Sequence, residues 1–213
     1  MSEPDTSIVT VTVDDVELEG DLRVPEGATG LVLFAHGSGS SRHSPRNNFV
    51  AERVRDRGVG TLLFDLLTEA EDETYETRFD ISLLTDRLVG ATEWVRRRPR
   101  TADLQLGYFG SSTGSAAALR AAARPETDVG AVVSRGGRVD LAADVLDRVS
   151  AATLFIVGGN DHPVLEWNRD AYEQLTGERS LEVIEGASHL FEEPGALEAV
   201  AEHAGTWFER TLV

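Results

Sequence analysis

Ser112 stands in a pattern that can build a nucleophile. In Gly110-Ser111-Ser112-Thr113-Gly114 a glycine lies two positions to either side of it, which is not true of Ser111 or Ser115. A serine on the sharp turn between a buried strand and a helix has a strained backbone and needs such small neighbours. The apolar run Leu104 to Phe109 precedes the pattern, and small residues follow it. We therefore predict that Ser112 is a catalytic nucleophile; the alternative is a plain Gly/Ser-rich turn.

A histidine must accept the proton of that serine, because a hydroxyl is a weak nucleophile near neutral pH. Where a serine stands on such a strand-to-helix turn, the order along the chain is serine, acid, histidine. His36 and His43 come before Ser112, so they do not fit that order. His189 follows the last apolar run, in a loop that leads to the terminal helix. We predict His189 as the base, against the alternative of a hydrogen-bonded structural histidine. Two other histidines follow Ser112. His162 lies beside Asp161, and His203 lies within the final helix.

Asp161 is the candidate for the acid that orients this histidine. It follows the apolar run Thr153 to Gly158, and the two glycines that end the run let the backbone turn toward the imidazole. The alternative is that Asp161 caps the helix that begins at Pro163 or Val164, since aspartate is common there. Three other aspartates are weaker candidates: Asp128, Asp140 and Asp144.

Backbone amides near Ser112 are candidates for stabilising a negatively charged oxygen. The amide of Thr113 lies at a helix N-terminus directly after the nucleophile. The second donor is expected from the loop after the run Leu31 to Ala35, where small residues let the backbone approach a substrate closely. We choose Ser38 as this second oxyanion donor, with Gly37 and Gly39 as alternatives.

Four arginines follow strand ends and are placed to face the same site: Arg42, Arg46, Arg135 and Arg138. A guanidinium there would bind a substrate carboxylate or phosphate through paired N–H donors. The alternative is that these arginines form surface ion pairs with this acidic chain.

The elements that must position these residues follow from the hydrophobic pattern. Segments 8–13 and 16–24 alternate apolar with polar residues and predict a hairpin. Six continuous apolar runs predict strands buried on both faces: Leu31 to Ala35, Gly60 to Leu67, Leu104 to Phe109, Val129 to Ser134, Thr153 to Gly158 and Leu181 to Ile184. Helical stretches separate them: Pro45 to Arg57, Ile81 to Arg98, Ser112 to Arg124, Asp140 to Val149, Val164 to Leu175 and Ala196 to Leu212.

This alternation predicts the α/β class: a doubly wound, mostly parallel eight-stranded sheet with helices on both faces. In such a sheet a ligand site lies beyond the carboxyl ends of the strands, where the candidate residues stand. We expect one domain over residues 1–213. The segment Thr68 to Arg78 has no apolar periodicity and is predicted to be a solvated loop, with a mobile flap as the alternative.

Composition limits the possible functions. The chain has 213 residues and a formal net charge of −17, which disfavours nucleic-acid and membrane-surface binding. It contains no cysteine and no lysine, which excludes thiolate and Schiff-base chemistry. The acidic, lysine-free composition suggests a halophilic source; the alternative is a GC-rich genome. The start of the chain is polar and acidic and no long apolar run occurs, so we expect a cytoplasmic protein.

Three motifs carry a resemblance to a known family: Gly-Ser-Ser-Thr-Gly, Gly-Gly-Asn-Asp-His around Asp161 and Gly-Ala-Ser-His-Leu-Phe around His189. Together with their order, they resemble the α/β-hydrolase superfamily, and the short chain without an inserted cap domain looks most like its dienelactone hydrolase-like branch. Dienelactone hydrolase itself uses a cysteine where this chain has Ser112. The loop 36–47 and segment 134–138 also resemble hydrolase-like proteins, some of them fused to phosphoribosyltransferase domains.

The resemblance implies a serine hydrolase that cleaves a small ester, lactone or thioester and needs no metal or organic cofactor. Its partner is then a small-molecule substrate. One alternative is a non-catalytic binding module or sensor on the same fold. Another is an acyltransferase or perhydrolase, which uses the same triad but passes the acyl group to an alcohol or peroxide.

Overall fold

A computed structural model describes residues 7–212. Its eight strands are β1 (Ser7–Val13), β2 (Val16–Arg23), β3 (Gly30–Ala35), β4 (Gly60–Phe64), β5 (Gln105–Ser111), β6 (Val129–Arg135), β7 (Ala152–Gly158) and β8 (Arg179–Ile184). The α-helices are α1 (Pro45–Asp56), α2 (Glu69–Asp72), α3 (Tyr75–Arg78), α4 (Ile81–Arg96), α5 (Thr113–Ala122), α6 (His162–Gln174) and α7 (Ala196–Thr211). Two segments are 3-10 helices: η1 (Pro125–Thr127) and η2 (Val139–Arg148).

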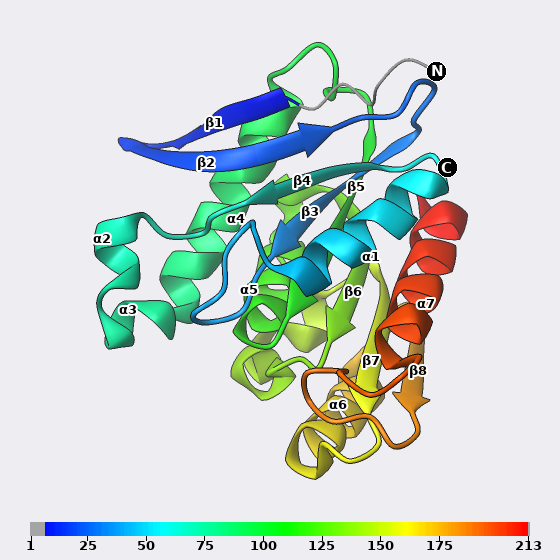
Figure 1. Cartoon of the computed structure of the whole chain (residues 1–213). Helices are drawn as coiled ribbons and strands as arrows, with labels where there is room; N and C mark the ends of the chain where they lie inside the picture. The colour runs from blue at the N-terminus through cyan, green and yellow to red at the C-terminus, as the bar shows by residue number, and fades with distance from the viewer. Residues whose placement is uncertain (1–6, 213) are drawn as a thin grey trace.

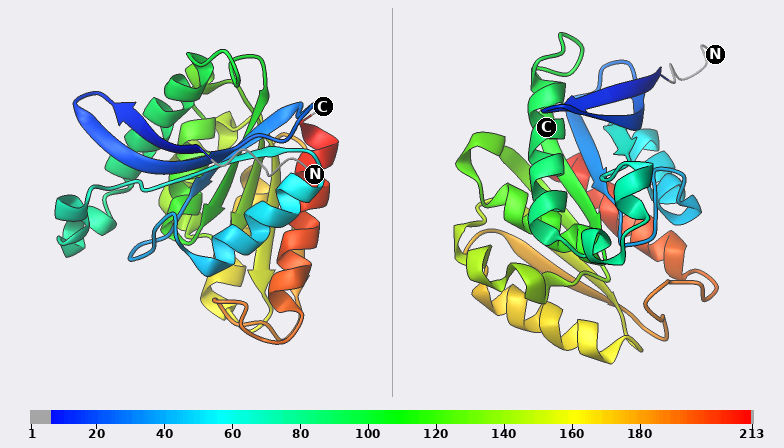
Figure 2. Two further views of the ribbon diagram at one scale, coloured as in Figure 1. Left: turned by 45° about the horizontal axis from the view of Figure 1, so that its top comes forward. Right: turned by 90° about the vertical axis from the view of Figure 1, so that its left-hand side faces the viewer.

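The strands form one sheet in the order β1-β2-β4-β3-β5-β6-β7-β8. The β1–β2 and β2–β4 pairs are antiparallel, and every later pair is parallel. Helices α1 and α7 lie on one side of the sheet and α4, α5 and α6 on the other (Figure 1). The views in Figure 2 show the same layers, with the β1–β2 hairpin at one edge. The predicted fold class is therefore confirmed.

The core explains why continuous apolar runs become the central strands. All six residues of β3 are buried, because helices cover both faces of the sheet at its middle. Alternate residues of each strand contribute to separate clusters. Leu33 and Tyr108 belong to the cluster under α4 and α5, while Phe34 and Phe109 belong to the one under α1 and α7. Edge strand β8 is only partly buried, and it carries charged residues that oppose further strand pairing.

One local prediction is wrong, and another is right about a helix but does not give its type. The segment Thr68 to Arg78 is not an irregular loop, because it contains the short helices α2 and α3. A capping box between Thr68 and Glu71 starts α2, and Arg87 of α4 binds the Glu71 carboxylate at 2.7 Å. Polar contacts thus stabilise a segment that lacks apolar periodicity. The stretch predicted as a helix from Asp140 to Val149 is the 3-10 helix η2.

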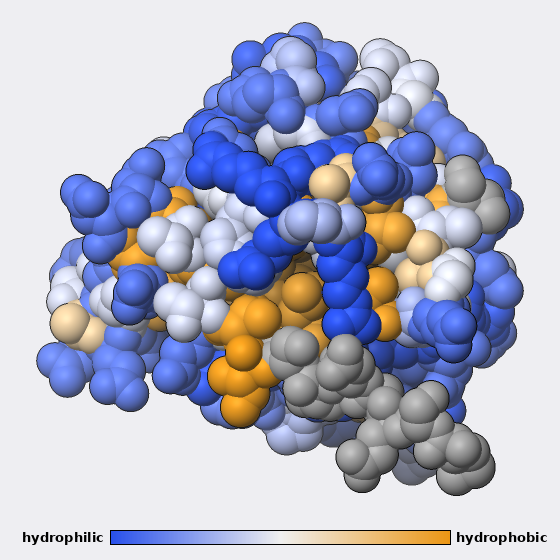
Figure 3. All heavy atoms as spheres, turned by 90° about the horizontal axis from the view of Figure 1, so that it is seen from above, coloured by the Kyte–Doolittle hydropathy of each residue, from blue (hydrophilic) through white to orange (hydrophobic). Residues whose placement is uncertain are grey.

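The surface agrees with the charge of the chain. Seen from above in Figure 3, hydrophilic residues cover most of this face and hydrophobic residues gather near its middle. Within residues 7–212, no helix has the length and apolar character needed to cross a membrane.

Candidate active site

Ser112 occupies a strained turn between β5 and α5. Its backbone φ is 51° and ψ is −120°, a region that non-glycine residues rarely adopt. There is no room for a side chain at either flanking glycine, Gly110 or Gly114. A Cβ on Gly110 would lie 2.4 Å from the Ser115 Cα, and one on Gly114 would lie 2.0 Å from the Ala35 carbonyl oxygen. The geometry is that of a nucleophile elbow.

Asp161 and His189 are brought together by the ends of β7 and β8. His189 Nδ1 lies 2.6 Å from Asp161 Oδ2, a distance at which the ring N–H donates to the carboxylate. Asp161 does occupy the N-cap position of α6, but its side chain accepts no capping hydrogen bond from the helix. The carboxylate therefore orients an imidazole and does not cap the helix.

Backbone contacts hold the two loops that carry this pair. The Gly159 amide donates to the Ile184 carbonyl and the Asn160 amide donates to the Ala187 carbonyl, both at 2.9 Å. A Cβ on Gly158 would lie 2.4 Å from the Ala187 oxygen, so glycine is needed for the loops to meet. Glu193, which sequence reasoning did not single out, accepts the Ser188 amide at 3.0 Å. Hydrogen bonds at Ala187 and Ser188 thus fix the loop that carries the His189 imidazole.

Ser112 and His189 flank the same peptide at the end of β6. The Ser112 amide donates to the Arg135 carbonyl at 3.2 Å, and a Cβ on Gly136 would lie 3.4 Å from the His189 ring. Among residues 7–212 no hydrogen bond joins the Ser112 hydroxyl to His189. Such bonds are often long without a substrate and tighten when one binds. The predicted acid and base are in contact, and the predicted nucleophile is linked to them through the Arg135–Gly136 segment at the end of β6.

The two predicted oxyanion donors are linked by a side chain. The Ser38 amide donates to the Thr113 hydroxyl at 2.9 Å, which connects the loop after β3 to the start of α5. A Cβ on Gly37 would lie 3.1 Å from the Ser112 Cβ, so glycine there lets this loop approach the elbow. Gly39 is exposed, with φ of 68°. Before the Ser38 amide can serve an oxyanion, it must release the Thr113 hydroxyl.

The other candidate acids and bases stand elsewhere. The Asp128 side chain is 95% exposed, so it is not part of a buried pair. Asp140 and Asp144 bind the guanidinium groups of Arg138 and Arg120. His43 and His162 are exposed, and His203 lies within α7. No group of three or more His, Asp or Glu side chains suited to a metal ion occurs among residues 7–212.

His36 is a structural residue with a fixed tautomer. Its Nε2 accepts the Leu66 amide at 3.0 Å, so the proton is on Nδ1, which donates to the Gly37 carbonyl at 3.0 Å. A protonated ring has no lone pair for the Leu66 amide. Burial lowers the pKa of His36 below its ordinary 6.5. The neutral ring therefore ties the loop after β3 to the end of β4.

We expect this histidine to make folding sensitive to acid. Because its folded pKa lies below 6.5, its contribution to stability is complete above that pH and is lost as the pH falls through the folded pKa. The limiting slope for one group is about 1.4 kcal/mol per pH unit. NMR of the His36 ring should show a neutral Nδ1–H form at pH 6.5, and urea unfolding should give lower stability at pH 5.5 than at pH 7. A His36 pKa of 6.5 or higher would contradict this account.

The four arginines divide into two kinds. Arg42 forms ion pairs with Asp65 and Glu19, and Arg138 binds Asp140 through two bonds of 2.9 Å. Carboxylates already pair with the guanidinium groups of Arg42 and Arg138. The structure therefore supports no role for these two side chains in substrate binding. Arg135 and Arg46 are not saturated. Two atoms of Arg135, Nε and Nη1, and Nε of Arg46 are buried without a hydrogen-bond partner in the described residues.

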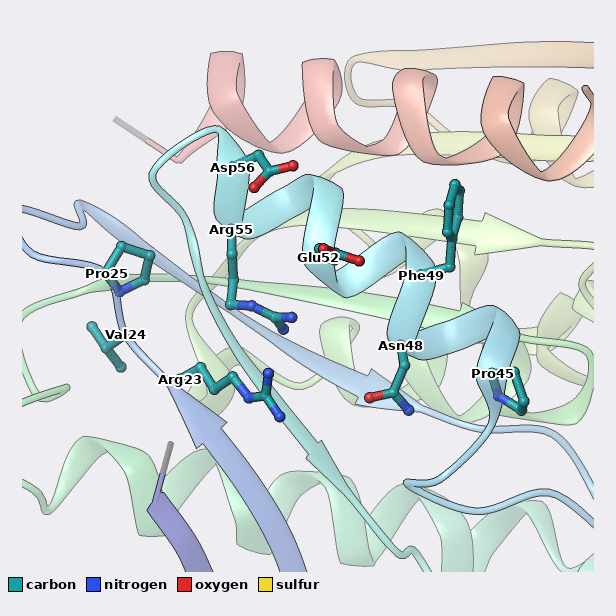
Figure 4. A pocket seen from close by; sticks show the side chains of 9 residues that line it. All are labelled: Arg23, Val24, Pro25, Pro45, Asn48, Phe49, Glu52, Arg55 and Asp56. Atoms are coloured by element: carbon teal, nitrogen blue, oxygen red, sulfur yellow. The ribbon is translucent and has the colours of Figure 1, made fainter. Parts of the chain in front are cut away.

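A hollow of about 670 Å³ lies beside α1, away from the acid–base pair. Figure 4 shows side chains from α1 and from the end of β2 around it, with the guanidinium groups of Arg23 and Arg55 on its floor. Arg23 binds Asp21 at 2.8 Å, and Arg55 donates to the Thr61 hydroxyl at 2.8 Å. Its cations already have partners and none of the predicted catalytic residues lines it, so we do not assign the reaction to this hollow.

The fold and the strand-end residues define the class as an α/β-hydrolase. Est1E from Butyrivibrio proteoclasticus has the same fold, with a TM-score of 0.81, 16% identity and coverage of 96% of this chain and 98% of that one. The crystal structure of dienelactone hydrolase from Anabaena variabilis is far more similar, at 56% identity, a TM-score of 0.96 and 99% coverage of both chains. The chain belongs to the dienelactone hydrolase family, and this more similar relative supports a hydrolase function.

Two curated relatives have another name. Proteins of two Mycobacterium tuberculosis strains, each named "putative phosphoribosyl transferase", are 55% identical over 200 residues, which is 94% of this chain and 45% of theirs. The chain thus spans about half the length of the curated relatives it matches. No family model matches the chain.

Proposed function

We propose that this protein is a serine hydrolase that cleaves a small ester, lactone or thioester through an acyl-enzyme. The observation that carries the proposal is the 2.6 Å contact between Asp161 and His189, made by an aspartate that leaves its helix uncapped. The strained turn at Ser112, whose amide binds the segment that packs against the His189 ring, supports the same proposal. Membership of a family with hydrolase neighbours supports the same chemistry.

In the first half of the reaction Ser112 Oγ attacks the substrate carbonyl carbon while His189 Nε2 accepts the hydroxyl proton. Asp161 holds the ring through Nδ1 and stabilises the positive charge that forms on it. The negative carbonyl oxygen accepts hydrogen bonds from the amide of Thr113 and from that of Ser38, once the Ser38 amide has released the Thr113 hydroxyl. When the intermediate collapses, the bond to the leaving group breaks and the leaving atom takes the proton from His189.

In the second half, water repeats the sequence on the acyl-enzyme. His189 accepts a proton from the water as its oxygen attacks the ester carbon, and the same two amides stabilise the oxyanion. Collapse breaks the bond to Ser112 Oγ, which regains its proton from His189. Every proton is moved by one imidazole, so this proposal requires no cofactor.

The transferase name of the Mycobacterium relatives is not extended to this chain. That name describes proteins of which the chain matches 45%. In the part that matches, the strand-to-helix turn carries Ser112 between two glycines, and the chain has no lysine to bind phosphates at a nucleotide-binding loop. These features favour acyl chemistry.

A fluorophosphonate probe tests the nucleophile directly, because it reacts covalently with activated serines. We expect one probe molecule per chain, attached to Ser112. Trypsin cuts this lysine-free chain at arginines, so the adduct falls on the peptide 101–120, where tandem mass spectrometry must separate Ser112 from Ser111 and Ser115.

The matched control is His189→Ala, which removes the base and should prevent labelling at the same probe concentration. An adduct on Ser111 or Ser115, or labelling that survives loss of His189, would refute the assignment. Full ligand binding with no adduct and no turnover would favour the non-catalytic alternative.

A further inference from the structure

Arg135 is a buried cation without a counterion. It ends β6 and is 9% exposed, and its Nε and Nη1 have no hydrogen-bond partner among the described residues. The nearest aromatic group is Phe191, whose ring centroid lies 5.9 Å from the guanidinium carbon. A ring face at that distance compensates little of the lost hydration. Buried charges are normally paired, so an unpaired one indicates a missing ligand.

A second cation lies near the first. Burial, and after it the charge of Arg46, lower the pKa of Arg135 to about 10, and no carboxylate offsets them. Arg46 Nη1 lies 3.4 Å from a Glu192 oxygen, a long contact to a side chain that is 65% exposed. Arg46 therefore has one weakly held carboxylate partner, and Arg135 has none among the described residues. By contrast, Arg138 at the same edge has its own bidentate partner.

The position of Arg135 connects it to the reaction. Its own carbonyl accepts the Ser112 amide, and the next residue, Gly136, packs against the His189 ring. Phe191 and Glu192, which lie beside the two arginines, belong to the loop that carries His189. A group held by these arginines therefore lies against the loop that carries His189, and it can be part of the same substrate.

We propose that Arg135 and Arg46 form a subsite for a phosphate monoester on the substrate, so that the enzyme prefers phosphorylated esters. The proposal rests on the serine hydrolase function proposed above. A phosphate carries close to two negative charges at neutral pH and has three acceptor oxygens. Its three oxygens can accept from the free N–H groups of both guanidinium groups, whereas a carboxylate offers only two acceptor oxygens.

Three nitrophenyl esters with acyl chains of equal length, ending in methyl, carboxylate or phosphate, test this preference. We expect the phosphate ester to have the highest kcat/KM. Arg135→Met should lower kcat/KM for the phosphate ester by about 10² to 10³-fold, the usual effect of losing one partner of a buried charge pair. The loss for the methyl ester should be much smaller, because that substrate has no anionic group for Arg135 to bind. Because methionine removes a buried unpaired charge, we expect the variant to fold.

The matched control is Arg138→Met, which removes a guanidinium paired with Asp140 from the same edge of the sheet and should retain the phosphate preference. An equal loss on all three esters in Arg135→Met would show a structural role and overturn the proposal. A preference for the carboxylate ester over the phosphate ester would overturn the choice of a dianion.

A binding measurement separates this proposal from the catalytic one. Calorimetry with inorganic phosphate should show binding to the wild type and none to Arg135→Met. If the wild type hydrolyses no ester but binds phosphate through Arg135, the subsite is supported and the serine hydrolase function is not. If esters are hydrolysed and phosphate does not bind, the subsite is refuted and the hydrolase function stands.

Discussion

Replacing Ser112 with alanine is expected to lower kcat for a short-chain nitrophenyl ester by about 10⁶-fold, as removal of a triad serine typically does. The rate falls because no other atom can form the acyl-enzyme. Alanine also has a Cβ, so it adopts the φ of 51° at the same backbone cost as serine, and the fold should be retained. Steady-state kinetics and a thermal unfolding curve measure these two effects separately.

The double variant sharpens this prediction. Ser112, His189 and Asp161 act as one unit, so Ser112→Ala combined with His189→Ala should be no slower than either change alone. Additive losses would mean that the two residues act in separate steps. A Ser112→Ala variant with substantial activity would contradict the proposed mechanism, whatever the activity of the double variant.

The triad candidates were predictable because strand order fixes them. Parallel strands all deliver their carboxyl ends to one edge, so the residues after β5, β7 and β8 lie along the same edge of the sheet however far apart they are in the chain. Strand order alone could not decide whether Asp161 orients a histidine or caps α6. The orienting role was preferred because a predicted base, His189, was available to pair with it. Short polar signals were less visible: Thr68 and Glu71 form a capping box, but without apolar periodicity they did not predict α2.

The partners of the arginines could not be predicted from the sequence. Arg42 binds Asp65 and Glu19, which come from other strands, and nothing local marks those carboxylates as its partners. In a chain with 37 acidic residues, an ion pair was the expected outcome for every arginine. Arg135 lies instead near Phe191, a non-glycine residue with φ of 55° that no sequence signal indicates.

Replacing Gly114 with alanine is expected to disrupt the turn between β5 and α5 that carries Ser112. The new Cβ would lie 2.0 Å from the Ala35 oxygen and 2.6 Å from the His36 oxygen, and both are backbone atoms held in place by β3 and its loop. Either α5 or the loop after β3 must then move. We expect a loss of more than about 4 kcal/mol in unfolding free energy, at the upper end for single substitutions, or failure to fold. Urea unfolding monitored by circular dichroism measures this loss.

Gly130→Ala is the matched control, since Gly130 lies in the neighbouring strand β6 and the closest atom to its added Cβ is 3.6 Å away. Alanine there should change stability by less than about 1 kcal/mol, and a small gain is expected because glycine in a strand is entropically costly. If both variants were equally stable, Gly114 would not be needed for close approach. The strained position of Ser112 would then have to depend on something other than the contact between α5 and the loop after β3.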